Sequence, residues 1–116
     1  MPQISDEQLA KLRAENPRGV KVYTVGPAEG EGPSDHYVFR TVDRATYTQY
    51  RAHQKRGLVG QGPSDPASIL AKNLLLFPSA QDFDALRERA PAITEEFGEL
   101  LAADADAGLV VTEGKH

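Results

Sequence analysis

The three histidines are the first residues to consider for metal or acid–base chemistry. His36, His53 and His116 lie far apart in the sequence, and none has a second His, Asp or Glu at a helical metal-ligand spacing such as HExxH. The chain of 116 residues has no cysteine, which excludes disulfides, thiol nucleophiles and cysteine-based zinc sites. We therefore expect neither a metal ion nor a cofactor.

Glycines and carboxylates offer the next candidates for chemistry. Gly57, Gly60 and Gly62 resemble part of a phosphate-binding loop, but the GxGxxG and GxxxxGK[ST] spacings are absent. The carboxylates of residues 82–106 fall mainly on the polar side of a predicted amphipathic helix, where nothing desolvates one of them for acid–base work. We predict that the protein is not an enzyme.

Cations alternate with aromatic residues in residues 36–56, HYVFRTVDRATYTQYRAHQKR. Aromatic platforms among cations are typical of proteins that bind single-stranded nucleic acid, which gives one weaker alternative function. A pI of about 5.3 and the absence of the glycine-flanked aromatic pattern of an RNA-recognition sheet argue against nucleic acid as a partner. We favour aromatic residues in a core and cations on a protein-binding face.

The charges are distributed unevenly along the chain. Residues 36–56 carry a net charge of +4, whereas residues 82–106 carry −6. Two such regions can attract each other within one subunit or between subunits, or can be solvated helix faces. The candidate protein-interaction residues come from these two regions: Arg40, Arg44, Tyr47, Arg51, Lys55, Glu95, Glu96 and Glu99.

Two predicted strands lead into this cationic stretch. Residues 20–25, VKVYTV, are rich in β-branched side chains. Residues 37–42 alternate, with Tyr37 and Phe39 on one face and the intervening residues on the other. We expect an antiparallel hairpin with a long polar tip at residues 28–34.

Capping residues mark the helices that follow and precede the hairpin. Ser5 and Gln8 form a capping-box pattern, Asp43 is placed to cap the helix after the second strand, and Asp65 precedes a proline at a first helical position. Pro91 either kinks the last helix or begins a new one. The predicted helices span about 5–15, 43–56, 66–76 and 79–103.

Together these elements predict one α+β domain, an antiparallel β-hairpin (about 20–25 and 37–42) packed against three to four helices. Residues 1–19 form an N-terminal helical arm, 20–106 the domain, and 107–116 a tail in which 109–112 either adds a short strand or is disordered. No apolar run approaches the roughly 20 residues of a membrane span, and no signal peptide is recognisable, so we expect a soluble, cytoplasmic protein. The predicted core residues are Phe39, Tyr47, Tyr50, Leu70, Leu74, Phe83, Leu86, Phe97 and Leu101.

The central stretch resembles the small tail assembly chaperones of long-tailed bacteriophages. The resemblance covers roughly residues 37–104: a strand reading YVFR, a helix beginning RATYTQY, an apolar run ending in Phe77-Pro78, and an acidic final helix. The chain departs from the family pattern in having Val42-Asp43 where a proline is frequent, in lacking the cysteine often found in the apolar run, and in residues 109–112, which match nothing in it.

This resemblance implies a non-enzymatic chaperone that binds the tape-measure protein, helps to recruit tail-tube protein, and acts as a homo-oligomer in the host cytoplasm. A long apolar helical partner needs a host that exposes apolar surface reversibly, and the two oppositely charged regions offer a route to self-association. The alternative is a structural component of a phage tail, a baseplate or a contractile injection particle.

Overall fold

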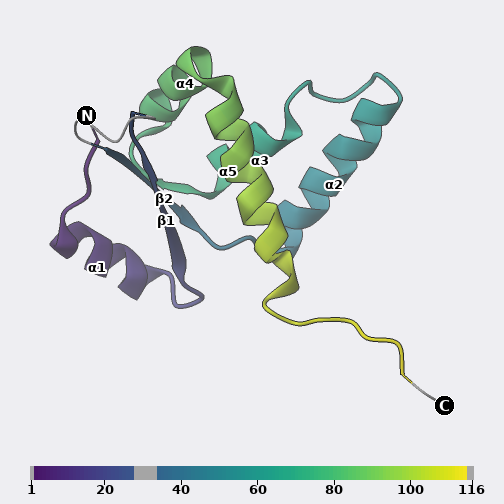
Figure 1. Ribbon diagram of the computed structural model, residues 1–116, viewed down its shortest axis with the longest axis horizontal. Coiled ribbons are helices and arrows are strands. Elements are labelled where there is room, and N and C mark those ends of the chain that lie inside the picture. The colour runs from purple at the N-terminus through teal and green to yellow at the C-terminus, as the bar shows by residue number, and fades with distance from the viewer. Residues whose placement is uncertain (1, 28–33, 115–116) are drawn as a thin grey trace.

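The computed structural model describes residues 2–27 and 34–114, and its elements combine a small sheet with helices on both of its faces (Figure 1). In chain order they are α1 (Asp6–Glu15), β1 (Val20–Val25), β2 (Asp35–Arg40), α2 (Arg44–Leu58), α3 (Pro66–Leu74), β3 (Leu75–Phe77), α4 (Ala80–Arg89), α5 (Pro91–Ala103) and a 3₁₀ turn, η1 (Asp104–Asp106). The predicted α+β class and the hairpin are confirmed. The described residues contain five α-helices rather than three or four, because Pro91 begins a new helix.

The sheet has the order β1-β2-β3 and is antiparallel throughout. Val20 pairs with Arg40 and Val25 with Asp35, so β2 begins and ends two residues earlier than the predicted 37–42. The tip predicted at residues 28–34 lies outside the described residues except for Ser34.

The third strand was not predicted, because residues 75 and 76 were expected to be the last residues of the helix at 66–76, with Phe77-Pro78 terminating it. Leu75 has an extended backbone (φ −67°, ψ 129°), and the strand pairs Leu75 with Phe39 and Phe77 with Val38. A short run of leucines does not distinguish a helix end from a buried strand, and Pro78 disfavours a helical Phe77. The free edge of β2 then supplies partners for the backbone of this segment.

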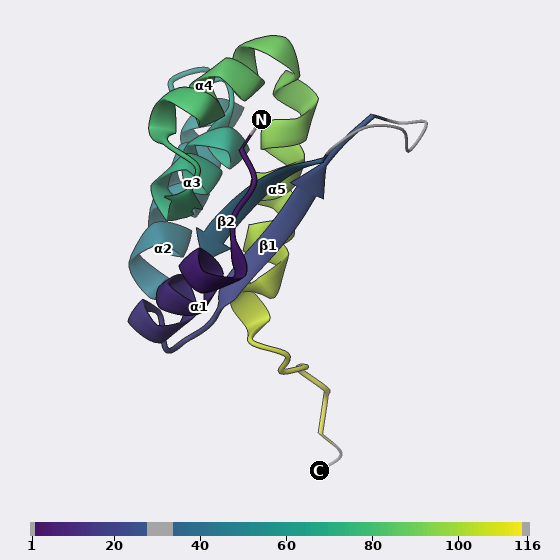
Figure 2. The same cartoon turned by 90° about the vertical axis from the view of Figure 1, so that its left-hand side faces the viewer.

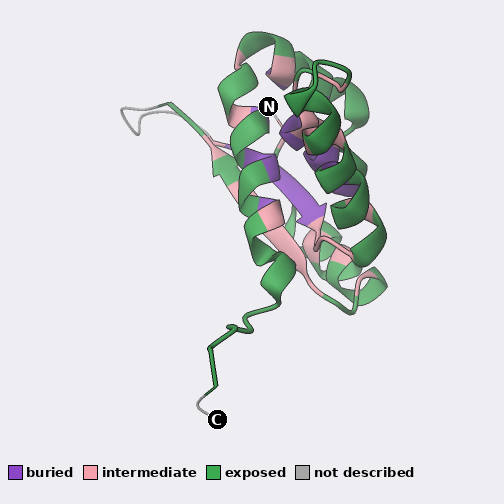
Figure 3. Ribbon diagram, turned by 90° about the vertical axis from the view of Figure 1, so that its right-hand side faces the viewer, coloured by how far each residue is buried: buried purple, intermediate pink, exposed green. Residues whose placement is uncertain are grey.

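One face of the sheet packs against α3 and α5, while α1 lies across the other face (Figures 1 and 2). The ring of Phe97, on α5, is the centre of an aromatic cluster on the first face. Its centroid lies 5.1 Å from that of Phe39, 5.3 Å from that of Tyr37 and 5.6 Å from that of Tyr23. Figure 3 shows the buried part of β2 between the covering helices. Tyr37 and Phe39 therefore join the hairpin to the helical body.

Val38 points to the opposite face of β2 and is nevertheless fully buried. The N-terminal arm crosses this face: the Ile4 N–H donates to His36 Nδ1 (3.0 Å), and the His36 N–H donates to Pro2 O (2.7 Å). The arm thus docks on the chain's own sheet, so that β2 is buried on both faces.

The predicted caps are present. Ser5 and Gln8 make a complete capping box, Asp43 caps α2, and Asp65 caps α3 with Pro66 at its first turn. Ser79 in addition caps α4, where it accepts the N–H of Asp82. These caps form because each side chain accepts a backbone N–H that the first helical turn leaves without a partner.

The buried core contains every predicted member except Tyr47: Phe39, Tyr50, Leu70, Leu74, Phe83, Leu86, Phe97 and Leu101. Placing Tyr47 in the core was wrong, because its side chain is 36% exposed and Tyr50 is the buried residue of α2. The two ring centroids lie 6.5 Å apart and the ring planes are tilted by 49°, so the exposed ring of Tyr47 neighbours the buried ring of Tyr50.

The C-terminal segment leads away from the body of the molecule (Figure 1). Residues 109–112 form no strand within the described part of the chain, and Leu109, Val110 and Val111 are highly exposed. Among the described residues, no helix combines the length and apolar character needed to cross a membrane.

Candidate protein-interaction site

A stripe of exposed side chains runs along one face of α2. Arg44, Tyr47, Arg51 and Lys55 follow one another at spacings of three or four residues, which places them on one side of the helix. The helix extends this far because residues 44–56 contain neither glycine nor proline. Within residues 2–27 and 34–114, none of the three cations of this α2 stripe forms an ion pair. The α2 stripe therefore presents its charge to solvent.

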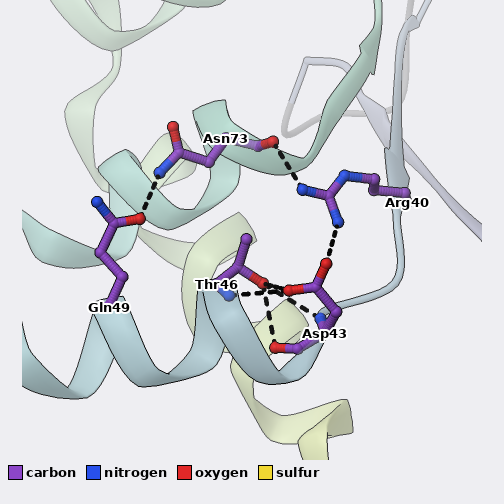
Figure 4. A network of polar contacts seen from close by, with 5 residues as sticks. All are labelled: Arg40, Asp43, Thr46, Gln49 and Asn73. Carbon is purple, nitrogen blue, oxygen red and sulfur yellow. Dashed lines mark hydrogen bonds and ion pairs between the residues drawn. The ribbon is translucent and has the colours of Figure 1, made fainter.

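Arg40 lies outside the α2 stripe, at the junction of β2, α2 and α3 (Figure 4). Its guanidinium donates to Asp43 Oδ2 (2.9 Å) and to the backbone oxygen of Asn73 (3.5 Å), and Asn73 Nδ2 donates to Gln49 Oε1 (3.4 Å). Arg40 thus connects three elements within one subunit.

Asp43 is the acceptor at the centre of this junction. The N–H and the hydroxyl of Thr46 each donate to Asp43 Oδ1 at 2.8 Å. These hydrogen bonds, followed by the contact with Arg40, lower the pKa of Asp43 from 3.8 to about 2. The carboxylate therefore stays ionised through the physiological range and fixes the direction in which α2 leaves the sheet.

The acidic residues of α5 do not form one patch. Glu99 lies close enough to Tyr50 that its charge, after the larger effect of burial, raises the pKa of the Tyr50 hydroxyl. That hydroxyl accepts a hydrogen bond from Gln54 Nε2 (2.9 Å). Glu95 lies one turn before Glu99, on the same side of α5. These two acids therefore belong to the side of α5 that approaches α2.

Glu96 faces a different part of the surface. It lines a groove of about 410 Å³ between β1 and α5. We call this the β1 groove, and its lining residues are Val22, Tyr23, Thr24, Val25, Gly26, Ile93, Glu96, Phe97 and Leu100. The eight residues expected to form a protein-interaction site are thus divided among the α2 stripe, the Arg40 junction, the α2-facing side of α5 and the β1 groove.

A pocket of about 580 Å³ lies at the C-terminal end of α2, where the following loop folds back. Arg51 and Lys55 contribute to both this α2 pocket and the α2 stripe. Leu58, at the rim, is 87% exposed. The full lining is Arg51, Gln54, Lys55, Gly57, Leu58, Gly60, Gly62, Pro63, Ser64 and Pro66. The α2 stripe and the α2 pocket form one continuous α2 surface that is both basic and apolar.

Gly62 explains how the loop comes so close to the helix. A Cβ at this position would lie 2.6 Å from Gly57 N and 2.8 Å from the backbone oxygen of His53, so a larger residue does not fit. Next to it, the Gln61 N–H donates to Arg56 O (2.9 Å). Of the three glycines in residues 57–62, Gly62 is thus required by close backbone packing, whereas a Cβ at Gly57 or Gly60 would meet nothing within 4 Å. No sequence pattern predicts the α2 pocket that this packing creates.

The histidines have separate surroundings in the structure. His36 accepts the N–H of Ile4, and His53 lies in the middle of α2. Over residues 2–27 and 34–114, no group of three or more His, Asp or Glu side chains could hold a metal ion.

The chain was also compared with models of protein families, with curated proteins and with solved structures, and none of them matches it. Its function therefore has to be inferred from its own residues and geometry.

Proposed function

We propose that this protein is a non-enzymatic tail assembly chaperone of a bacteriophage, which binds the tape-measure protein through its α2 surface and assists tail-tube assembly. The motifs that resemble the chaperone family support this proposal. The YVFR motif lies in β2, and RATYTQY is the beginning of α2. Asp43 joins them as the N-cap, so the resembling residues form one structural unit.

The observation that carries the proposal is the combination of charge and apolar exposure on the α2 surface. On this surface Leu58 is 87% exposed and Tyr47 is 36% exposed, together with the cations Arg51 and Lys55. Val59, which directly follows Leu58 at the end of α2, is 69% exposed. Exposed apolar side chains with a charged rim are typical of protein-binding surfaces. Such a surface fits an amphipathic helix whose apolar face is flanked by acids.

The binding partner that matches this chemistry is a long apolar helical protein that needs protection from aggregation. Contact with the α2 surface would bury apolar side chains of the partner, while Arg44, Arg51 and Lys55 attract its acidic residues and orient it. A chaperone of this kind acts in the host cytoplasm as an oligomer whose copies coat the partner.

Co-expression with the tape-measure protein of the same genome tests this function. Wild-type protein should raise the soluble fraction of the tape-measure protein, and R44E/R51E should lose most of that effect. The matched control is K11E/R13E on α1, which changes the net charge equally on the opposite side of the sheet and should act like wild type. An unchanged soluble fraction with wild-type protein contradicts the proposal, and so does equal activity of both variants.

Mass spectrometry of finished particles separates the chaperone from the alternative, a structural component of a phage tail, baseplate or contractile injection particle. A chaperone should be absent from purified particles. Stoichiometric recovery of this chain from them would favour the structural role.

A further inference from the structure

The outer edge of β1 has no partner strand among the residues that the structure describes. Val20–Val25 pairs with β2 on its other side over its whole length. Exposed edge strands are usually protected by proline, by a bulge or by several charges. The sequence VKVYTV has no proline and one charge, Lys21, so this edge can accept another strand.

The β1 groove lies directly beside this edge. Its floor includes Ile93, Phe97 and Leu100 of α5, and Leu100 is 44% exposed. A strand added next to β1 would lie about 4.8 Å from it, with alternate side chains directed into the β1 groove. The edge therefore offers both backbone hydrogen-bonding groups and an apolar surface for every second side chain.

Residues 109–112, LVVT, have the composition of a strand but no partner within the described part of the chain. The exposed fractions of Leu109, Val110 and Val111 are 77%, 82% and 99%. The segment projects away from the helices, as Figure 3 shows. β-branched residues in this number favour an extended backbone and gain most when they pack against a sheet.

We propose that residues 109–113 of one copy add to β1 of a second copy as an antiparallel fourth strand. One register matches both the apolar alternation and the charges. Leu109 lies opposite Val25, Val111 opposite Tyr23, and Glu113 opposite Lys21. Directly opposite residues share a face of the sheet, so Leu109 and Val111 enter the β1 groove, and Glu113 forms an opposite-charge pair.

The position of Gly108 explains why the strand comes from a second copy. Gly108 and Lys21 line the same surface cavity, and Lys21 contacts Asp104 at 3.3 Å. A chain's own tail therefore starts beside Lys21, and along β1 it would run parallel, carrying Glu113 away toward Val25. The antiparallel register with the Glu113–Lys21 pair requires a tail that approaches from the Val25 end.

The contact joins two different surfaces, so it is heterologous. Reciprocal exchange of tails closes a dimer, and successive exchange in one direction gives a ring or a filament. This inference does not depend on the proposed function, because it rests on β1 and the tail rather than on the α2 surface.

Disulfide trapping tests the register directly, because the natural chain has no cysteine. Thr24 and Val110 are opposite in the proposed register. Thr24 borders the β1 groove, but its side chain alternates with that of Tyr23 and so lies on the face of the sheet away from Phe97, whereas Val111 lies opposite Tyr23 on the Phe97 face. Two singly substituted chains, T24C and V110C, are mixed and oxidised, and T24C with V111C is the control. We expect a disulfide-linked mixed dimer of T24C and V110C. Its yield should be at least tenfold higher than the yield of the mixed dimer in the control. Equal yields in the two mixtures overturn the proposal.

Sedimentation of the cysteine-free chain gives an independent measurement. Wild-type protein should associate as its concentration rises, and V111D should stay monomeric with unchanged thermal unfolding, because Val111 is almost fully exposed in the subunit. Identical sedimentation of wild type and V111D overturns the proposal.

Discussion

The hydroxyl oxygens of Ser68 and Thr94 lie 2.8 Å apart, and both residues are fully buried where α3 packs on α5. Thr94 also donates to the backbone oxygen of Pro91 (3.1 Å), so Ser68 is the donor to Thr94. One turn along α5, Gly98 lies against the backbone of Ala67. Helix α5, which supports the sheet, is therefore held close to α3 by the Ser68–Thr94 hydrogen bond and by the absence of a side chain at Gly98.

Replacing Thr94 with valine should destabilise the protein by about 1–3 kcal/mol, because the buried hydroxyl of Ser68 loses its acceptor. S68A should lower the unfolding free energy less than the Thr94 variant does, since the Thr94 hydroxyl still donates to the backbone oxygen of Pro91. In urea unfolding, the double variant S68A/T94V should lose less unfolding free energy than the two single variants lose together. Strictly additive costs would show that the two hydroxyls are not coupled.

Gly98→Ala should destabilise the protein by about 3 kcal/mol, because overpacked cores must shift backbone. The added Cβ would clash with the backbone oxygen and carbonyl carbon of Ala67, and backbone atoms cannot move aside as a flexible side chain can. Gly57→Ala is the control, since nothing lies within 4 Å of a Cβ at that helical position. That change should stabilise α2 by about 0.5–1 kcal/mol. Thermal unfolding measures both, and a harmless G98A would contradict the close packing of α3 and α5.

The stability of the protein should fall in acid as Asp43 is protonated. Its pKa is about 2 in the folded protein and 3.8 ordinarily, so its contribution is complete above about pH 4 and is lost as the pH falls toward 2. Because the side chain is partly exposed, we expect this contribution to be roughly 1 kcal/mol. D43N keeps a capping side chain that does not titrate, so the difference in unfolding free energy between wild type and D43N should shrink over that pH interval. A constant difference would contradict this role of Asp43.

Reversing the charges of Arg44 and Arg51 should leave the subunit's unfolding free energy within about 0.5 kcal/mol of wild type, as is usual for exposed charges. Both side chains are exposed, and the hydrogen bond from Arg51 to Gln54 Oε1 is on the surface. Thermal unfolding of R44E/R51E checks this expectation. A large loss of stability would mean that the α2 stripe serves the fold rather than a partner.

The local parts of the fold could be predicted from the sequence. The caps at Ser5, Asp43 and Asp65 involve residues only three positions apart, so their signals are complete within one turn of helix. The hairpin was predictable because residues 20–25 are rich in β-branched side chains and residues 37–42 alternate between two faces. Pro91 left two possibilities, of which the structure shows a new helix.

The remaining features depend on contacts that are distant in the sequence. Residues 75–77 become a strand because β2 has a free edge, and Val38 is buried because the N-terminal arm crosses its face. Tyr47 and Tyr50 are one turn apart, but only contact with the rest of the fold decides which of them is buried. The β1 groove and the α2 pocket likewise arise from elements that meet only in the folded chain.

Hydrogen exchange of this chain, alone and in complex with the co-expressed tape-measure protein, tests the central claim most directly. If the α2 surface binds the partner, amides of residues 51–64 should exchange more slowly in the complex, while those of α1 should be unchanged. Unchanged exchange over residues 51–64 in a verified complex would contradict the claim.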